Sequence, residues 1–242
     1  MLELRNITYE VDDNNENKEI LKNVSVTIDD HFVAITGPNG GGKSTLAKMI
    51  AGIIRPTSGQ ILLDGEDITG LNITERARKG ISFAFQQPVR FKGLTVRDLL
   101  HLSTSKQKSD QELSQYLTEV GLNASNYINR EINASLSGGE LKRIEIAMLM
   151  ARGVDLSLFD EPEAGIDLWS FHNLIKVFEQ IRDTKRGAVV IISHQERILN
   201  IADKIVVISN GEIDTVGTRD EILPKLLSQS DTYQFHKVRE QQ

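Results

Sequence analysis

The chain has 242 residues and a formal net charge of −6, a length that suits one large α/β domain or a core with a smaller inserted subdomain. The acidic balance disfavours a dedicated nucleic-acid surface, which is normally basic, and the absence of cysteine excludes disulfides, thiolate metal sites and thiol nucleophiles. Charge begins at Glu3, unlike in a signal peptide, and no apolar run is long enough to span a membrane, so we expect a cytoplasmic protein that reaches any membrane through a partner.

Two segments with alternating apolar residues open the chain. Residues 2–11 and 20–28 place apolar side chains at roughly alternate positions, which is the period of a half-buried strand. Residues 12–17 between them are Asp, Asn and Glu, which include strong turn formers. The pattern predicts an antiparallel pair of strands at the N-terminus.

A glycine-rich stretch follows, between an apolar strand at residues 32–36 and a helix at residues 46–52. In that context the pattern G-x-x-x-x-G-K-[ST] binds phosphate, because glycines let backbone N–H groups turn toward the phosphate oxygens and the helix N-terminus adds partial positive charge. Lys43 would bring a full charge to the β- and γ-phosphates, and Ser44 a hydroxyl to Mg²⁺. The predicted phosphate-binding residues are Gly37, Pro38, Asn39, Gly40, Gly41, Gly42, Lys43, Ser44 and Thr45.

The composition changes in the middle of the chain. Residues 58–65 and 81–85 read as strands and residues 74–79 as a short helix, but from Thr95 to Asn133 the β-branched runs vanish and helical patterns dominate. We therefore predict a nucleotide-binding core of residues 1–86 and 154–227, an inserted helical subdomain of residues 87–153 and a polar tail of residues 228–242.

The second half of the chain continues the alternation of helices and strands. Helices are predicted at residues 136–152, 168–182 and 220–227, and buried strands at residues 154–160 and 188–193. Residues 204–208 and 212–216 flank Asn210 and Gly211, a pair typical of a β-hairpin turn.

Polar side chains follow three of the predicted strands. Asp160 and Glu161 close the strand at residues 154–160, and ligands gather at the carboxyl ends of parallel strands. We assign Asp160 to a metal and Glu161 to the attacking water; the alternative is a pair of acids that merely starts a loop. Gln86 could bind the metal, the water or neither, and His194 could donate to a γ-phosphate or be an ordinary surface residue.

The run Leu136-Ser137-Gly138-Gly139-Glu140 opens a helix between the phosphate-binding loop and the Asp-Glu strand. It resembles the signature motif of the ABC ATPase family, and the likeness extends over residues 2–227. The resemblance implies an α/β fold: a P-loop NTPase core with a parallel sheet, an N-terminal antiparallel β subdomain and an inserted α-helical subdomain. It also implies ATP hydrolysis with Mg²⁺, in which the catalytic residues are Lys43, Gln86, Glu161 and His194 and the metal ligands are Ser44, Gln86 and Asp160.

In this family two cassettes pair head to tail, which implies an ATP-dependent homodimer. Ser137, Gly138 and Gly139 would then cap the ATP of the partner, and Asp167 would lie in the loop that communicates across the interface. Most cassettes also stack an aromatic side chain on adenine near the end of the first strand. Val11 stands at that position here, and Tyr9, two residues earlier on the same face, could take its place.

Three runs, at residues 84–89, 136–146 and 192–199, look closest to the ATPase of the Suf iron–sulfur assembly system (SufC). That resemblance implies a SufB/SufD-like scaffold as the partner; the alternative is the ATP-binding subunit of a membrane transporter, with a transmembrane subunit as the partner. No nucleic-acid partner is expected. The partner surface should include Gln87, Pro88, Val89, Arg90 and Phe91, although Val89 and Phe91 could instead pack beneath the helical subdomain.

Overall fold

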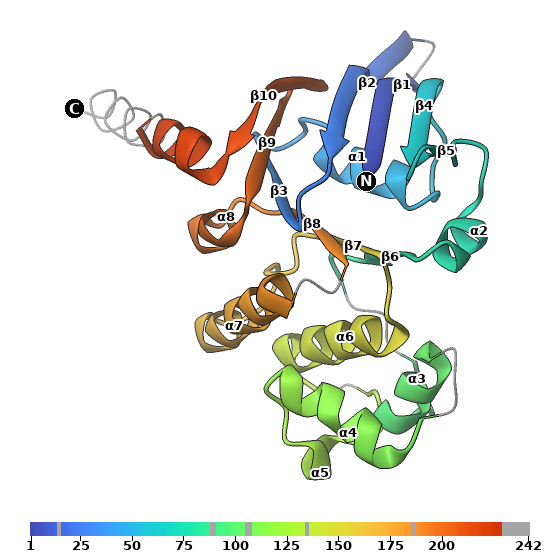
Figure 1. Ribbon diagram of the computed structural model, residues 1–242, viewed down its shortest axis with the longest axis vertical. Helices are drawn as coiled ribbons and strands as arrows, with labels where there is room; N and C mark the ends of the chain where they lie inside the picture. Colours follow the sequence, from blue (N-terminus) through green and yellow to red (C-terminus); the bar gives the residue numbers. More distant parts are fainter. Residues whose placement is uncertain (14–15, 88–90, 105–107, 134–135, 185–186, 229–242) are drawn as a thin grey trace.

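The computed structural model describes residues 1–13, 16–87, 91–104, 108–133, 136–184 and 187–228 (Figure 1). Two β-sheets lie at one end of the molecule, and a group of helices lies at the other. Pro88, Val89 and Arg90 of the predicted partner surface fall outside the described residues, as does most of the predicted polar tail.

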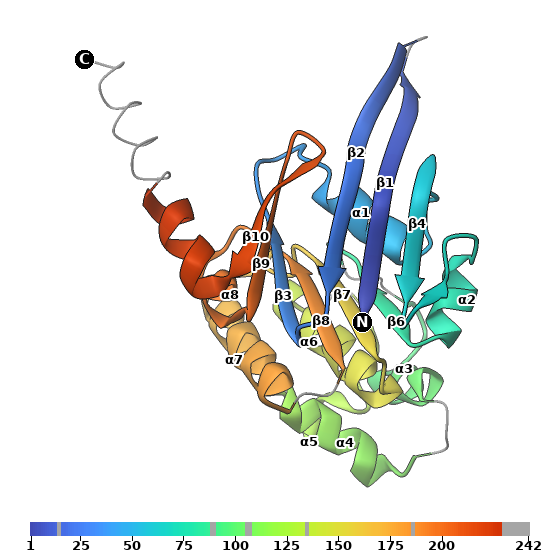
Figure 2. The same cartoon turned by 45° about the horizontal axis from the view of Figure 1, so that its top comes forward.

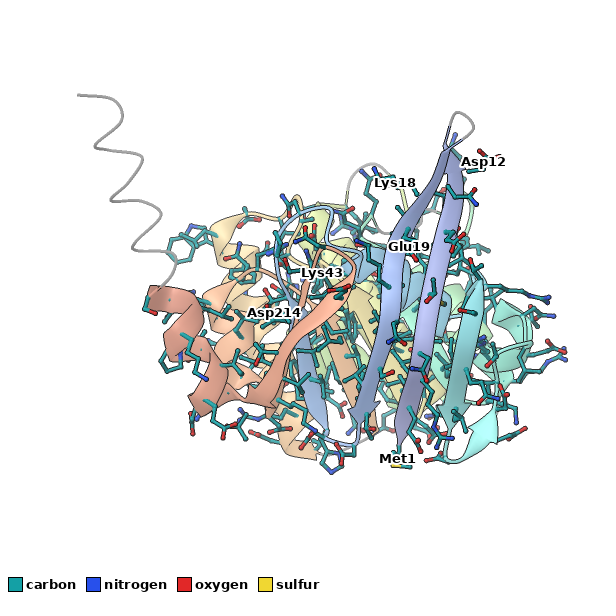
Figure 3. The ribbon with its side chains drawn as sticks, turned by 90° about the horizontal axis from the view of Figure 1, so that it is seen from above. Met1, Asp12, Lys18, Glu19, Lys43 and Asp214 are labelled. Carbon is teal, nitrogen blue, oxygen red and sulfur yellow. The ribbon has the colours of Figure 1, made fainter. Side chains whose placement is uncertain are left out.

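The smaller sheet is antiparallel and has the strand order β2-β1-β4-β5. Its strands are β1 (Leu2–Asp13), β2 (Glu16–Ile28), β4 (Ser58–Leu63) and β5 (Glu66–Asp67). Leu4 of β1 is paired with Val26 of β2 and Ile61 of β4, and all three side chains are buried. The antiparallel pair expected from the alternating pattern is therefore confirmed. Met1 and Asp12 mark opposite ends of β1 in Figure 3.

The larger sheet has the order β10-β9-β3-β8-β7-β6. Neighbouring strands from β9 to β6 are parallel, and β10 turns back antiparallel to β9. The predicted hairpin at Asn210 and Gly211 makes this turn, with both residues at positive φ. The strands are β3 (Phe32–Thr36), β6 (Ile81–Ala84), β7 (Leu156–Asp160), β8 (Ala188–Ile192), β9 (Lys204–Ser209) and β10 (Glu212–Thr218).

The larger sheet is covered on both faces, which explains why its parallel strands are continuous apolar runs. Phe32 and Ala34 of β3 face one core cluster, and Val33 and Ile35 face another. Helix α1 (Lys43–Ile50) packs between the two sheets, because its apolar residues belong to the same cluster as those of β1, β2 and β8 (Figure 2). On the other face lie α6 (Gly138–Arg152), α7 (Leu168–Thr184) and α8 (Glu196–Ile201).

The helical part lies between β6 and β7 in the chain. Helices α3 (Val96–Ser103), α4 (Asp110–Glu119) and α5 (Ala124–Tyr127) gather below α6, away from the antiparallel sheet (Figure 1). Helix α2 (Ile73–Arg78) precedes β6, and residues 219–228 are also helical. The predicted α/β fold, with its parallel sheet, antiparallel sheet and helical region, is confirmed. Within the described ranges, no helix has the length and apolar character to cross a membrane.

Candidate functional site

The glycine-rich loop joins β3 to α1 and is held between two strands. Gly37 has φ 130°, and a Cβ built on it would lie 1.9 Å from the backbone oxygen of Ile208 in β9. Gly42 has φ 100°, and its Cβ would lie 2.7 Å from Leu21 of β2. Only glycine fits at these two positions, because both the space and the backbone conformation exclude a side chain.

Lys43 lies at the start of α1 and folds back over the loop. Its Nζ donates to the backbone oxygens of Gly37 and Pro38, each at 2.8 Å, and the residue is 5% exposed. Burial lowers the pKa of Lys43, while the charges of Glu161 and Asp160 oppose the shift. No side chain caps the first turn of α1, so its N–H groups are open to an anion. The loop therefore offers a cation and free donors at one place.

Ser44 and Asp160 are brought together from α1 and from the end of β7. The Ser44 hydroxyl donates to Asp160 Oδ1 at 2.8 Å. Burial raises the pKa of Asp160, and the hydrogen bond from Ser44 opposes the increase. A hydroxyl and a carboxylate are hard oxygen ligands of the kind that Mg²⁺ prefers. The donor set fits the predicted metal site.

Glu161 lies between Gln86 and His194, because the three residues follow the ends of the neighbouring strands β6, β7 and β8. The Gln86 amide donates to Glu161 Oε2 at 2.8 Å, and His194 Nε2 is 3.6 Å from Glu161 Oε1. Glu161 has φ 44°, which is uncommon for a residue with a side chain, and its backbone N–H donates to Ile192 of β8 at 3.0 Å. Burial lowers the pKa of His194, and the positive charge of Lys43 lowers it further.

A cavity of about 560 Å³ extends along the glycine-rich loop. Gln86 and Glu161 line one part of it, and Lys18 and Ile20 of β2 line another. Figure 3 shows Lys18 on the side of β2 that faces Lys43. Tyr9 instead packs against the apolar core and does not line the cavity, and neither does Val11, which is paired with Lys18. Base stacking by Tyr9 and nucleotide binding at Val11 stay predictions. Lys18 and Ile20 were not predicted from the sequence.

The predicted signature residues lie at the start of α6 and do not line this cavity. Ser137 caps the helix: its Oγ accepts from the Glu140 N–H at 3.2 Å, and its own N–H donates to the Glu140 carboxylate at 2.7 Å. Gly138 and Gly139 form the first turn. The structure thus contains a second glycine-containing helix start that is separate from the chain's own phosphate-binding loop.

Two further contacts, which the sequence analysis did not predict, hold the cluster around Glu161. The Ser193 hydroxyl donates a short hydrogen bond to Glu163, and burial raises the pKa of the Glu163 carboxyl. Lys142 of α6 donates to the backbone oxygen of Phe85 at 2.6 Å and to Glu145 at 2.8 Å. The Ser193–Glu163 and Lys142–Phe85 contacts join segments far apart in the chain, so no local pattern predicts them.

Phe91 and Gln87 are the described members of the predicted partner surface. Phe91 is 41% exposed and lines an apolar groove of about 700 Å³ together with Phe85 and Glu145. Gln87 lines a smaller pocket with Asp160. Phe91 therefore remains available for a contact with a partner.

The sequence matches the family model described as ABC transporter over residues 21–164. An uncharacterized ABC transporter ATP-binding protein of Methanocaldococcus jannaschii is 41% identical over 215 residues, which cover 85% of this chain and 86% of that protein. The probable ATP-dependent transporter ycf16 of Cyanophora paradoxa is 32% identical, with coverage of 90% and 88%. The lipopolysaccharide export system ATP-binding protein LptB of Escherichia coli K12 is 30% identical, with coverage of 85% and 87%.

The fold is similar to that of solved ATP-binding cassettes. A dimeric cassette in a post-hydrolysis state, bound to ADP and Pi, superposes with a TM-score of 0.80 at 26% identity, covering 90% of this chain and 99% of that one. A nucleotide-free cassette from an ABC transporter superposes with a TM-score of 0.79, with coverage of 94% and 95%. These comparisons confirm the resemblance drawn from the signature run, and the chain belongs to the ABC transporter family of ATP-hydrolysing, ATP-binding cassettes.

Proposed function

We propose that this chain is the ATP-hydrolysing subunit of an ABC transporter and that its site works with Mg²⁺. The observation that carries the proposal is the position of Glu161, which contacts Gln86, lies near His194 and lines the cavity along the glycine-rich loop. The names of the three relatives above favour a transporter. Two are named as ATP-binding proteins, one of an ABC transporter and one of an export system, and the third is named as a probable ATP-dependent transporter.

Binding of ATP would replace contacts that the loop now makes with itself. Lys43 would exchange two backbone oxygens for phosphate oxygens, while the N–H groups of the loop and of α1 donate to the same phosphates. Ser44 and Asp160 would hold Mg²⁺, which supplies positive charge against the β- and γ-phosphates. Burial strengthens these electrostatic interactions because less water screens them.

Glu161 is the proposed general base of hydrolysis. It would orient a water molecule and accept its proton as the water oxygen bonds to the γ-phosphorus and the bond to the β-phosphate oxygen breaks, giving ADP and phosphate. Burial and Lys43 favour a neutral His194, which can donate a hydrogen bond to the γ-phosphate. Gln86 already donates to Glu161 and would orient it or the water.

A second cassette would complete the site. Ser137, Gly138 and Gly139 start a helix but do not line the cavity of their own chain. In a head-to-tail pair, this helix N-terminus would donate to the γ-phosphate bound by the other chain. The dimeric cassette with ADP and Pi supports a paired arrangement.

A second candidate role is the ATPase of an iron–sulfur assembly scaffold. The runs at residues 84–89, 136–146 and 192–199 favour it, and the absence of cysteine in this chain is consistent with cluster building on a partner. The names of the relatives favour the transporter. The two roles share the site chemistry and differ in the partner.

Two variants test the site and one experiment tests the role. Lys43→Ala should weaken binding of a fluorescent ATP analogue and abolish turnover, and Glu161→Gln should bind ATP but hydrolyse it about 10²- to 10⁴-fold more slowly. Normal turnover by either variant would contradict the assigned roles.

Affinity capture from native lysate, with and without detergent, should recover a polytopic membrane protein only with detergent. Recovery of a soluble cysteine-bearing scaffold without detergent would assign the chain to the second role.

A further inference from the structure

Glu163 is a partly buried acid that the proposed mechanism does not use. It lies two residues after Glu161, in the turn that follows β7, and its Oε1 accepts the short hydrogen bond from the Ser193 hydroxyl. Its other oxygen, Oε2, is buried and receives no hydrogen bond from the part of the chain that the structure describes. Burying a carboxylate with one oxygen unpaired costs stability, so packing alone does not explain an acid at this position.

Ser193 extends this contact to the backbone around His194. Ser193 is fully buried, and its N–H donates to the backbone oxygen of Ile35 in β3 at 3.1 Å. Its hydroxyl oxygen accepts from the N–H of Gln195 at 3.0 Å, which closes a small turn with His194 inside it. A hydroxyl can donate only one hydrogen bond. Donation to Glu163 therefore fixes the direction of the Ser193 side chain and, with it, this turn.

The Glu163–Ser193 contact is a second link between the segments that carry the proposed base and the histidine. The first link is the backbone hydrogen bond of 3.0 Å from the Glu161 N–H to Ile192, at the ends of the paired strands β7 and β8. Between these links, Glu161 Oε1 lies 3.6 Å from His194 Nε2. The relative position of the base and the imidazole therefore depends on both links.

We propose that Glu163 is a positioning residue for hydrolysis, which acts through Ser193 to hold His194 beside Glu161 in the orientation that serves the γ-phosphate. The inference rests on the proposed function and adds a residue to the same site. Glu163 is not among the described residues that line the cavity along the glycine-rich loop, so its effect is indirect. A displacement of about 1 Å in a catalytic group can cost about 10²-fold in rate.

Single-turnover release of phosphate by the full-length protein, at saturating ATP-Mg²⁺, tests this role in two backgrounds. With the histidine in place, Glu163→Leu should slow hydrolysis by about tenfold to 10²-fold. The Kd of a fluorescent ATP analogue should change little, because Lys43 and the loop still bind the phosphates. Glu163→Gln should retain most of the rate, since its side-chain oxygen can still accept from Ser193. In His194→Ala, Glu163→Leu should have little further effect, because no imidazole is left to position.

Two further variants act as a second test and a control. Ser193→Ala removes the other partner of the contact and should slow hydrolysis by a similar factor, which keeps the test decisive if Glu163→Leu does not fold. Glu221→Leu is the matched control, because Glu221 accepts from the Thr218 hydroxyl at 3.0 Å in a hydroxyl–carboxylate pair at the end of β10. Glu221→Leu should leave the rate unchanged. The urea unfolding midpoint of each variant shows whether it is folded.

The outcomes separate this inference from the proposed function. If His194→Ala hydrolyses ATP at the unmutated rate, the proposed role of His194 fails and this inference fails with it. If His194→Ala is slow but Glu163→Leu and Ser193→Ala are not, only this inference is overturned. The same holds if Glu163→Leu causes an equal loss in both backgrounds, which is the result expected of a merely structural residue. A loss confined to the protein that retains His194 would support both.

Discussion

Removing the charge of Lys142 should cost stability and loosen the active site together. Lys142 is 1% exposed, and its Nζ donates to the backbone oxygen of Phe85 and to the Glu145 carboxylate. The Phe85 backbone also hydrogen-bonds Glu145, so the pair binds Phe85 through its main chain. Phe85 directly precedes Gln86, the residue that donates to Glu161.

The expected magnitude follows from the burial of this pair. Burial raises the pKa of Glu145, and Lys142 is the main group that opposes the increase. In Lys142→Met the carboxylate loses its cation inside the protein, a change that typically costs about 3–5 kcal/mol. We expect the lower end, about 3 kcal/mol, because the Glu145 side chain is still 19% exposed. Adding Glu145→Gln should recover much of the loss, because a neutral amide needs no counter-charge.

Urea unfolding at several pH values measures this effect. Because the folded-state pKa of Glu145 is raised above its ordinary value of 4.5, its contribution to stability is greatest when the carboxyl is protonated and is lost as the pH rises through the folded pKa. Removing Lys142 raises that pKa further, so the deficit of Lys142→Met should be larger near neutral pH than near pH 4.5. A pH-independent loss, or a loss that Glu145→Gln does not reduce, would refute the reasoning. ATP hydrolysis by Lys142→Arg should exceed that by Lys142→Met, because arginine keeps the charge.

Three further predictions concern other parts of the molecule. Arg76 is fully buried, burial lowers its pKa to about 10, and its guanidinium donates to the backbone oxygens of Met49 and Ile50 at the end of α1. Arg76→Met should therefore lower the free energy of unfolding, measured in urea, by about 3 kcal/mol or more. An unchanged unfolding midpoint would contradict this. The pKa of His194 lies below its ordinary value of 6.5. If protonation of His194 causes the loss of ATPase rate at low pH, His194→Ala should remove that loss, and the midpoint of the loss in the unmutated protein should lie below pH 6.5. A midpoint above that value would exclude a neutral His194 as the active form. Val11 is paired with Lys18, which lines the cavity, so Val11→Tyr should tighten ATP binding about tenfold by base stacking, as measured by competition with a fluorescent analogue. Equal affinity would show that the base does not bind at the end of the cavity lined by Lys18.

Much of the fold is predictable because its signals are local. The run at residues 32–36 is apolar at every position but the last, which predicts a strand buried on both faces, and β3 packs against a core cluster on each side. Asn210 and Gly211 predict the hairpin between β9 and β10, because they adopt positive φ readily. Helix α8 was not predicted, since its six residues are too few to show a helical period clearly.

The candidate site was predicted only in part, for a physical reason. Gln86, Glu161 and His194 each follow an apolar strand, so their meeting is implied once the strands are parallel neighbours. Lys18 and Ile20 line the cavity because the antiparallel sheet folds over the glycine-rich loop, which is a tertiary contact that no pattern in β2 shows. Ordinarily exposed residue types such as Lys and Arg give no signal when a fold buries them, as it does Lys142 and Arg76.

The contacts around Glu161 imply how a partner could influence hydrolysis. Gln86 is tied through Phe85 to Lys142 on α6, the helix that begins with the signature residues. On the other side, Glu163 holds Ser193, the residue before His194. Gln86, on one side of Glu161, is therefore anchored to the helix that carries the proposed dimer surface. A movement of α6 relative to the core sheet must stretch the Lys142–Phe85 contact or carry Gln86 with it, because α6 and the strand end that holds Gln86 are joined there by a hydrogen bond of 2.6 Å. For that reason docking of a second cassette at the start of α6 should alter the position of Gln86 as well as close the site.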